Sequence, residues 1–170
     1  NLIVWGKHNA GMGSFYRSQH ELITDLKNGD APHLNTFELG QHGRHRSNLW
    51  SYAGGNSFHA GRAEDLAMHP TSKPVALLAD AIRDVSRRGA IVLDAFGGSG
   101  STLIAAEKTG RNACLLEIDP SYCDVIIRRF ETYTGKNARL DQDGQTFEQV
   151  ESTRQAECTD LDAGGSAGRD

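Results

Sequence analysis

Hydrophobic positions recur at helical spacing in the middle of this 170-residue chain, and short apolar runs alternate with them. In the segment 74–89, Val75, Leu78, Ile82 and Val85 lie three or four positions apart, with proline first and glycine after a basic last turn, which predicts a helix. The following pattern predicts strands over 90–94 and 112–118 and helices over 101–110 and 120–135. Helix, strand, helix, strand, helix is typical of a doubly wound α/β unit with a parallel sheet.

The chain before this unit has a different pattern. Residues 1–7 and 14–29 are predicted strands, the second ending at an Asn28-Gly29 turn signal, so we expect an antiparallel pair. Residues 30–68 show no period and are rich in His, Gly and Asn. A long loop-rich segment of this kind is often functional.

Charge separates the end of the chain from the rest, within a net charge of −4. Residues 1–140 hold 16 Lys and Arg against 14 Asp and Glu, whereas residues 141–170 hold 2 against 8. This acidic tail has few large apolar side chains, so we expect it to be disordered. The near-neutral body is compatible with nucleic acid without requiring it.

Apolar runs and cysteines exclude several classes of protein. No apolar run approaches about 18 residues and no secretory signal pattern is visible, so we expect a cytoplasmic protein with no membrane contact. The three cysteines lack CxxC spacing, which favours buried free thiols over disulfides or zinc. His42 and His45 are spaced like metal ligands but have no evident third ligand, so no metal is expected.

The most informative stretch is VLDAFGGSGST, at positions 92–102, where a strand ends in an acid and enters a glycine-rich turn. It lacks the lysine of a P-loop and the third glycine of a dinucleotide fingerprint. Glu117 ends the next predicted strand, 23 positions after Asp94, about the offset at which a carboxylate reaches ribose hydroxyls. These residues favour a nucleoside site, and a tight turn beside an ordinary surface acid explains them equally well.

The segment HPTSKPVALL at 69–78, followed by the glycine loop and then EIDPSY at 117–122, resembles the DNA amino-methyltransferases, in the motif order of their β-type arrangement. The resemblance covers about Leu2 to Arg139. It implies a Rossmann-like class I methyltransferase sheet, circularly permuted and incomplete in this chain. It also implies an S-adenosylmethionine site made by ten residues: Lys73, Pro74, Asp94, Phe96, Gly98, Ser99, Gly100, Ser101, Thr102 and Glu117. Of these, Lys73 and Pro74 would close over the methionine end and Glu117 would take the ribose hydroxyls.

The resemblance further divides the chain into functional segments. Residues 1–29 would end the catalytic subdomain, 30–68 would be a DNA-recognition segment, 69–140 would bind the cofactor, and 141–170 would form the tail. The implied reaction is methyl transfer to the exocyclic amine of adenine (N6) or cytosine (N4) in double-stranded DNA, with the base flipped out of the helix. The residues do not decide between the two bases, and they say nothing of oligomeric state or of a paired restriction enzyme.

The family's catalytic tetrapeptide, a polar residue followed by two prolines and an aromatic residue, is absent from the chain. We therefore assign no catalytic residue and expect this chain alone to be inactive, the motif belonging to a preceding segment. DPSY at 119–122 lacks the second proline and is explained as a helix start, with Asp119 as N-cap and Pro120 as first residue.

Candidate DNA contacts are Arg44, His45 and Arg46 in the loop-rich segment, with Lys7 and Arg17 as further phosphate contacts. A solvated basic loop is the alternative interpretation. Two other functions also remain open: a methyltransferase acting on RNA, protein or a small molecule, and a non-catalytic module that binds cofactor or DNA.

Overall fold

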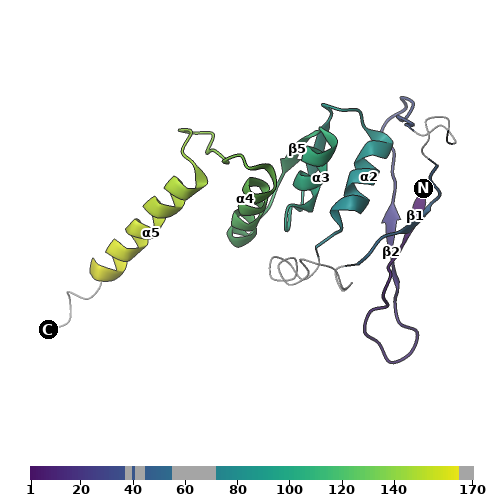
Figure 1. The fold of residues 1–170 in the computed structure, drawn as a ribbon, viewed down its shortest axis with the longest axis horizontal. Helices are drawn as coiled ribbons and strands as arrows, with labels where there is room; N and C mark the ends of the chain where they lie inside the picture. Colours follow the sequence, from purple (N-terminus) through teal and green to yellow (C-terminus); the bar gives the residue numbers. More distant parts are fainter. Residues whose placement is uncertain (37–39, 41–44, 55–71, 165–170) are drawn as a thin grey trace. The chain divides into compact units, whose positions relative to one another are not determined.

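The computed structural model describes residues 1–36, 40, 45–54 and 72–164, with side chains described to residue 156. The chain divides into two compact units, Asn1–Ile126 and Ile127–Asp170. The first unit contains both small sheets. Figure 1 labels the helices α2 to α5.

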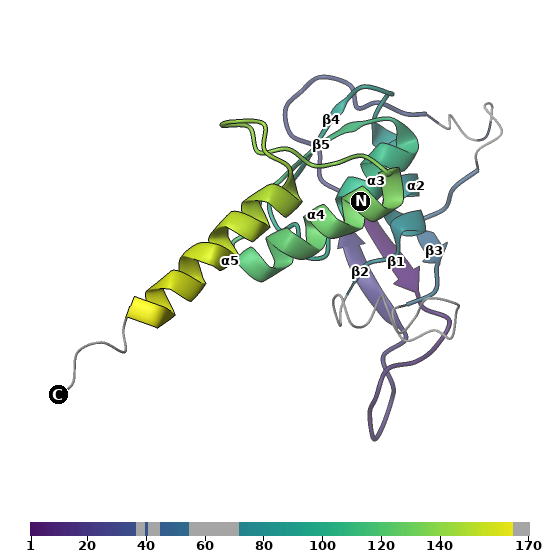
Figure 2. The ribbon, with the colours of Figure 1, turned by 60° about the vertical axis from the view of Figure 1, so that its left-hand side comes forward.

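Three strands form the first sheet (Figure 2): β1 (Leu2–Gly6), β2 (His20–Thr24) and β3 (Leu49–Ser51). Their order is β2-β1-β3. β1 and β2 are antiparallel, which confirms the predicted pair, and β3 runs parallel to β1. The strand predicted over 14–29 is shorter in the structure, because only His20–Thr24 pairs with β1 and residues 14–19 belong to the connecting loop. β3 was not expected, because it is three residues long and lies within a segment whose composition predicts a loop.

The second sheet consists of β4 (Ile91–Asp94) and β5 (Asn112–Leu115), which are parallel. Three helices accompany it: α2 (Val75–Val85), α3 (Ser101–Thr109) and α4 (Pro120–Thr134). The order α2-β4-α3-β5-α4 confirms the predicted alternation of helices and strands. Asp119 accepts a hydrogen bond from the backbone N–H of Ser121 at 2.9 Å, so the start of α4 is capped as expected.

α2 is the central element of this unit, because it contributes to both hydrophobic clusters. Toward α3, four residues form one buried cluster: Ala79, Ile82, Ala105 and Ala106. Toward the first sheet, Leu77 packs with Trp5 and Trp50. The small side chains of α3 let α2 approach closely, while the two tryptophans supply most of the apolar bulk of the other cluster.

The second sheet is covered on one face. Val92 of β4 and Ala113 of β5 pack against the α2–α3 cluster, whereas Ile91 and Leu93 on the other face are 73% and 69% exposed. Cys114 belongs to this open face and is exposed. The expectation of buried thiols is therefore wrong for Cys114, because no part of the described chain covers the face that carries it.

The structure has a helix, α5 (Phe147–Gly164), where the sequence composition predicts a disordered tail. Two local features stabilise its start. Thr146 and Gln149 form a reciprocal capping box, in which the N–H of Thr146 donates to Gln149 Oε1 at 2.9 Å. In addition, Arg128 pairs with Glu151 at 2.5 Å and lies over the ring of Phe147. The TFEQ pattern at 146–149 was the sequence signal for this helix.

Among the described residues, no helix combines the length and the apolar character that crossing a membrane requires. The same residues contain no group of three or more His, Cys, Asp or Glu side chains placed to hold a metal ion. His42, one of the two spaced histidines, lies outside the described residues.

Candidate functional site

A cleft of about 460 Å³ lies where β4 and β5 end. This is the edge at which open parallel α/β sheets bind their ligands. Twelve residues line it: Ser72, Lys73, Leu78, Asp94, Phe96, Gly97, Gly98, Ser99, Ser101, Thr102, Glu117 and Tyr122. The stretch that stood out in the sequence, from the end of β4 to the start of α3, contributes seven of these twelve residues.

Asp94 holds the glycine loop in shape. Its Oδ1 accepts the backbone N–H of Phe96 at 3.0 Å, and its Oδ2 accepts the hydroxyl of Thr102 at 2.6 Å. Both carboxylate oxygens are therefore engaged within the protein, one at the start of the loop and one in the first turn of α3. The side chain of Phe96, 89% exposed, projects from the loop that Asp94 fixes.

Glu117 connects the end of β5 to the same loop. Its Oε2 accepts the N–H of Gly98 at 2.7 Å, and its Oε1 accepts the N–H groups of Ile118 and Asp119 at 2.9 and 3.0 Å. The hydrogen bonds from Asp119 and Gly98 hold the pKa of the Glu117 carboxyl below its usual range. An ionised carboxylate has about four acceptor positions, so Oε2 retains one for a hydroxyl donor in the cleft.

Three serine hydroxyls gather at the N-terminus of α3. Ser72 Oγ lies 3.1 Å from Ser99 Oγ and 3.2 Å from Ser101 Oγ, and the last two are 3.4 Å apart. Ser99 and Ser101 are each only 5% exposed. A helix N-terminus favours negative charge, and Lys73, next to Ser72, adds a cation at the same side of the cleft. This end of the cleft suits a carboxylate.

Lys73 is fixed by the first sheet. Its Nζ lies 3.2 Å from Glu21 Oε2, and Lys7 Nζ lies 2.6 Å from Glu21 Oε1. Partial burial acts to raise the pKa of Glu21, but hydrogen bonds from Lys7 and Lys73 outweigh it and leave that pKa below its usual value. Both ammonium groups also lie near the ring of Trp5, at 5.2 and 6.0 Å from its centroid. The β1–β2 hairpin is thus connected to the wall of the cleft.

Eight of the ten residues expected at a cofactor site line this single cleft. The other two flank it: Pro74 is the N-cap of α2 and Gly100 is the N-cap of α3. Ser72 and Tyr122 line the cleft and were missed. Tyr122 follows helical spacing and was interpreted as core, whereas Ser72 immediately precedes the Lys-Pro pair and its hydroxyl was the available signal.

The three residues expected to contact DNA are not equally available to a partner in the structure. Arg44 lies outside the described residues, and His45 is exposed. The guanidinium of Arg46 is engaged inside the protein: its Nε lies 2.8 Å from Asp84 Oδ2, and its Cζ lies 4.2 Å from the centroid of the Trp50 ring. Its side chain is only 16% exposed, so Arg46 connects β3 to α2.

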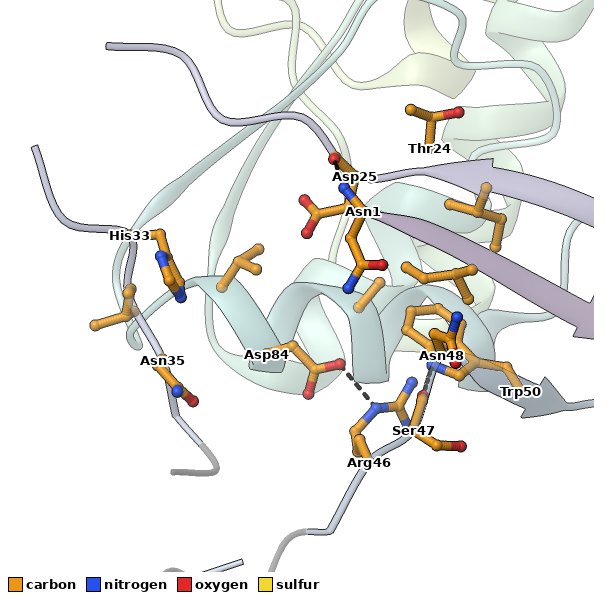
Figure 3. A pocket seen from close by; sticks show the side chains of 15 residues that line it. Asn1, Thr24, Asp25, His33, Asn35, Arg46, Ser47, Asn48, Trp50 and Asp84 are labelled. Carbon is orange, nitrogen blue, oxygen red and sulfur yellow. Dashed lines mark hydrogen bonds and ion pairs between the residues drawn. The ribbon is translucent and has the colours of Figure 1, made fainter. Parts of the chain in front are cut away.

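A second cleft, of about 370 Å³, lies beside Arg46 (Figure 3). Asn1 and Asp25 lie at its edge, with the N-terminal ammonium of Asn1 donating to the backbone oxygen of Asp25 at 2.6 Å. Arg46 and Asp84 face each other within it. Because it lies where β1 and β3 begin, it is at the edge of the strands that α/β proteins do not ordinarily use for ligands.

A glycine loop between strand and helix, with an acid at the end of the next strand, defines a Rossmann-like α/β protein with a nucleoside-type site. The family model described as DNA methylase matches residues 1–128. The chain belongs to this family, which confirms the expected fold class and the resemblance to N6/N4 DNA amino-methyltransferases.

Curated relatives agree with this assignment. The type II methyltransferase M2.MboI of Moraxella bovis is 26% identical over 141 residues, which cover 79% of this chain and 50% of the relative. The orphan methyltransferase M.BamHII of Bacillus amyloliquefaciens is 32% identical over 108 residues, covering 63% of this chain and 40% of the relative. The chain therefore spans about half the length of the curated relatives it matches.

Solved structures give the same fold. A protein from Thermus thermophilus, assigned as a DNA modification methylase and complexed with S-adenosyl-L-methionine, is 26% identical with a TM-score of 0.51, over 80% of this chain and 54% of that one. The cytosine-N4-specific PvuII DNA methyltransferase is 19% identical with a TM-score of 0.55, over 84% and 51%. The second likeness shows the fold alone.

Proposed function

We propose that this chain forms the S-adenosylmethionine-binding part of a DNA methyltransferase. The observation that carries the proposal is the cleft at the ends of β4 and β5, which has a cationic, hydroxyl-rich side at Lys73 and Ser72 and an ionised acceptor at Glu117. Those groups match the methionine carboxylate and the ribose of the donor, and Phe96 and Tyr122 offer aromatic surface for the adenine. The volume lies within the range of small-molecule sites, about 300–1,000 Å³.

We further propose that the acceptor is the exocyclic amine of adenine (N6) or cytosine (N4) in double-stranded DNA, flipped out of the helix. The bound donor supplies an activated methyl group on its sulfonium. This chain's own residues orient the donor: Asp94 fixes the loop, Glu117 and Lys73 hold the two polar ends, and the helix N-terminus complements the carboxylate. The family match supports DNA as acceptor, and the groups that align the amine belong to a catalytic motif that this sequence does not contain.

Isothermal titration calorimetry of the chain with S-adenosylmethionine tests the proposal, with NAD as the control ligand. We expect binding of S-adenosylmethionine alone. In Glu117→Gln we expect affinity to fall about tenfold or more, because a charge-assisted hydrogen bond is lost. Glu148→Gln makes the same chemical change at an exposed position of α5 and should leave binding unaltered.

Circular dichroism of the same samples establishes that each variant is folded. A folded wild-type chain that binds no S-adenosylmethionine, or that binds NAD equally well, would overturn the proposed donor site.

A further inference from the structure

The loop between β1 and β2, residues 7–19, projects beyond the ends of both strands (Figures 1 and 2). Its base is closed by backbone hydrogen bonds. The N–H of Lys7 donates to the oxygen of Gln19 at 2.8 Å, and the N–H of Gly11 donates to the oxygen of Ser18 at 2.8 Å. In addition, the side-chain Nε2 of Gln19 donates a hydrogen bond to the backbone oxygen of Lys7 at 2.9 Å. The loop therefore has a built stem that presents its tip.

Arg17 stabilises the tip from within the loop. Its Nε donates to the oxygen of Gly11 at 2.9 Å, and its Nη2 donates to the oxygen of Ala10 at 3.2 Å. A guanidinium that bonds two successive carbonyls restricts the backbone opposite it. The residues next to Arg17 are thereby held in one arrangement before any partner arrives, which lowers the ordering cost of binding.

Three large apolar side chains occupy this tip in full contact with solvent. Met12, Phe15 and Tyr16 are 99%, 81% and 91% exposed. The rings of Phe15 and Tyr16 lie together, with centroids 4.3 Å apart and planes inclined by 53°. Aromatic rings gathered on a projecting loop are a feature of binding surfaces, because isolated exposure of that much apolar area is unfavourable.

The charge of the loop indicates which partner it fits. Residues 7–19 contain Lys7, His8 and Arg17, and no Asp or Glu. Lys7 is paired with Glu21 at the stem, whereas Arg17 bonds to neutral carbonyl oxygens and brings its positive charge to the loop. Exposed aromatic rings on an acid-free, cationic loop match nucleic acid, whose bases offer flat faces for stacking and whose backbone carries negative charge. Apolar side chains that enter a base step and unstack it are an established way to deform a duplex.

The position of the stem places this loop at the methyl-donor side of the molecule. Glu21 follows the loop directly and bridges Lys7 at its base to Lys73 in the wall of the donor cleft. The loop thus leaves the first sheet at the edge where the donor cleft lies. A base rotated toward that cleft would leave a gap in the duplex, and the aromatic tip of this loop is the group that we consider for filling it.

We propose that the β1–β2 loop is a wedge, in which Phe15 and Tyr16 enter the base stack of duplex DNA and fill the space left by the flipped base. Arg17 acts as a positioning residue that holds the two rings for insertion. This inference rests on the proposed function, because it takes DNA as the acceptor. The role proposed for the loop is contact with DNA, and it is separate from binding of the methyl donor in the cleft.

The wedge is tested by fluorescence anisotropy with two DNA duplexes, one intact and one carrying a single abasic site. The abasic duplex has a preformed gap, so the chain should bind it more tightly than the intact duplex. In the double variant Phe15→Ala/Tyr16→Ala this preference should fall about tenfold, since stacking on an aromatic ring is lost. Tyr133→Ala, half-exposed on α4, is the matched control and should keep the preference.

Each other outcome counts against the wedge. If the double variant keeps the preference, or if the wild-type chain shows none, the wedge is overturned while the donor site stands. If the chain binds S-adenosylmethionine in the calorimeter but neither duplex, the wedge is overturned and DNA as acceptor loses its support. Loss of S-adenosylmethionine binding, by contrast, overturns the donor site and not the wedge.

Discussion

Two constraints favour glycine at position 100: a left-handed backbone conformation and close packing against Ile126. Gly100 is the N-cap of α3 with φ +76°, and a Cβ built on it would lie 3.2 Å from two side-chain carbons of Ile126. Gly89 has φ +79° with nothing within 4 Å of such a Cβ. Gly89→Ala should therefore lower the free energy of unfolding by about 1–2 kcal/mol, because the only penalty is that of an alanine in a left-handed backbone conformation. Gly100→Ala should cost roughly 1 kcal/mol more, from overpacking against Ile126.

Urea unfolding of the two variants measures that difference, and the background Ile126→Ala identifies its source. If the clash with Ile126 is the cause, Gly89→Ala and Gly100→Ala should become equally costly once Ile126 is truncated. An excess cost that survives in the Ile126→Ala background would place the constraint elsewhere in the loop.

The charge of Glu117 leads to a prediction about pH. Hydrogen bonds from Asp119 and Gly98 lower its pKa, so the carboxylate stays ionised through the neutral range and its contribution to donor binding is lost only as pH falls through the lowered value. Affinity for S-adenosylmethionine should thus be flat from about pH 7.5 to about pH 5, above the ordinary glutamate pKa of roughly 4.3. Calorimetry across this pH range checks the prediction. If the affinity falls between these two pH values, a group with a higher pKa than Glu117 controls donor binding.

At the scale of elements, Arg46 adds a polar connection between β3 and α2 to the apolar packing of Trp50 on Leu77. It pairs with Asp84, which is 7% exposed, and lies over Trp50. Arg46→Met should lower the free energy of unfolding by about 3 kcal/mol, because it removes one partner of a mostly buried ion pair. Arg87→Met, at an exposed position just after α2, should change it by less than about 0.5 kcal/mol.

Thermal and urea unfolding measure both variants, and DNA binding by the same proteins separates the two roles considered for Arg46. A variant Arg46→Met that keeps its stability and loses DNA affinity would contradict the structural role and restore the DNA contact expected from the sequence.

The sequence predicted some elements better than others for physical reasons. α2 and α4 have the apolar period and a proline at the start, α3 is closed by Gly110, and β4 and β5 lie between them, so local pattern was sufficient. β3 was missed because three residues in a loop-like segment have no period, and their pairing with β1 depends on a contact 45 positions away in register, Trp5 opposite Trp50. The start of α5 was missed because net charge and composition outweighed a short capping signal.

The candidate site shows the same division. The meeting of the glycine loop and Glu117 at one cleft could be predicted, because both follow the ends of neighbouring parallel strands, and their role toward a methyl donor stays a prediction. The hydroxyl of Ser72 beside Ser99 and the bridge from Glu21 to Lys73 could not, since each joins segments distant in sequence. Arg46 illustrates the converse: a basic cluster indicates charge, and only the fold shows that the charge is already paired.

At the scale of the whole molecule, the second sheet is the most unusual feature. Parallel sheets in α/β proteins are normally covered on both faces, yet one face of β4–β5 exposes Ile91, Leu93 and Cys114. The chain also spans only about half the length of its curated relatives. Within the part of the chain that the structure describes, no strand pairs with the outer edge of β4 and no layer covers this apolar face, which favours association between copies of this chain.

We therefore expect this chain to bind an apolar dye such as ANS and to self-associate as its concentration rises, as measured by sedimentation velocity. The double variant Ile91→Thr/Leu93→Thr places a β-branched side chain at both strand positions and removes the apolar surface, so dye binding and association should both fall. Because both side chains are largely exposed, the free energy of unfolding should change by less than about 0.5 kcal/mol for each.

Val92→Thr is the matched control, since Val92 lies on the covered face of the same strand and packs against the α2–α3 cluster. It should leave dye binding by the folded chain unchanged and cost about 1 kcal/mol or more, because a hydroxyl replaces a packed methyl group. A wild-type chain that stays monomeric and binds no dye would mean that the face is covered in solution. Equal stability losses at the two sites would show that Ile91 and Leu93 are packed, and the one-sided sheet would then be the wrong description of this unit.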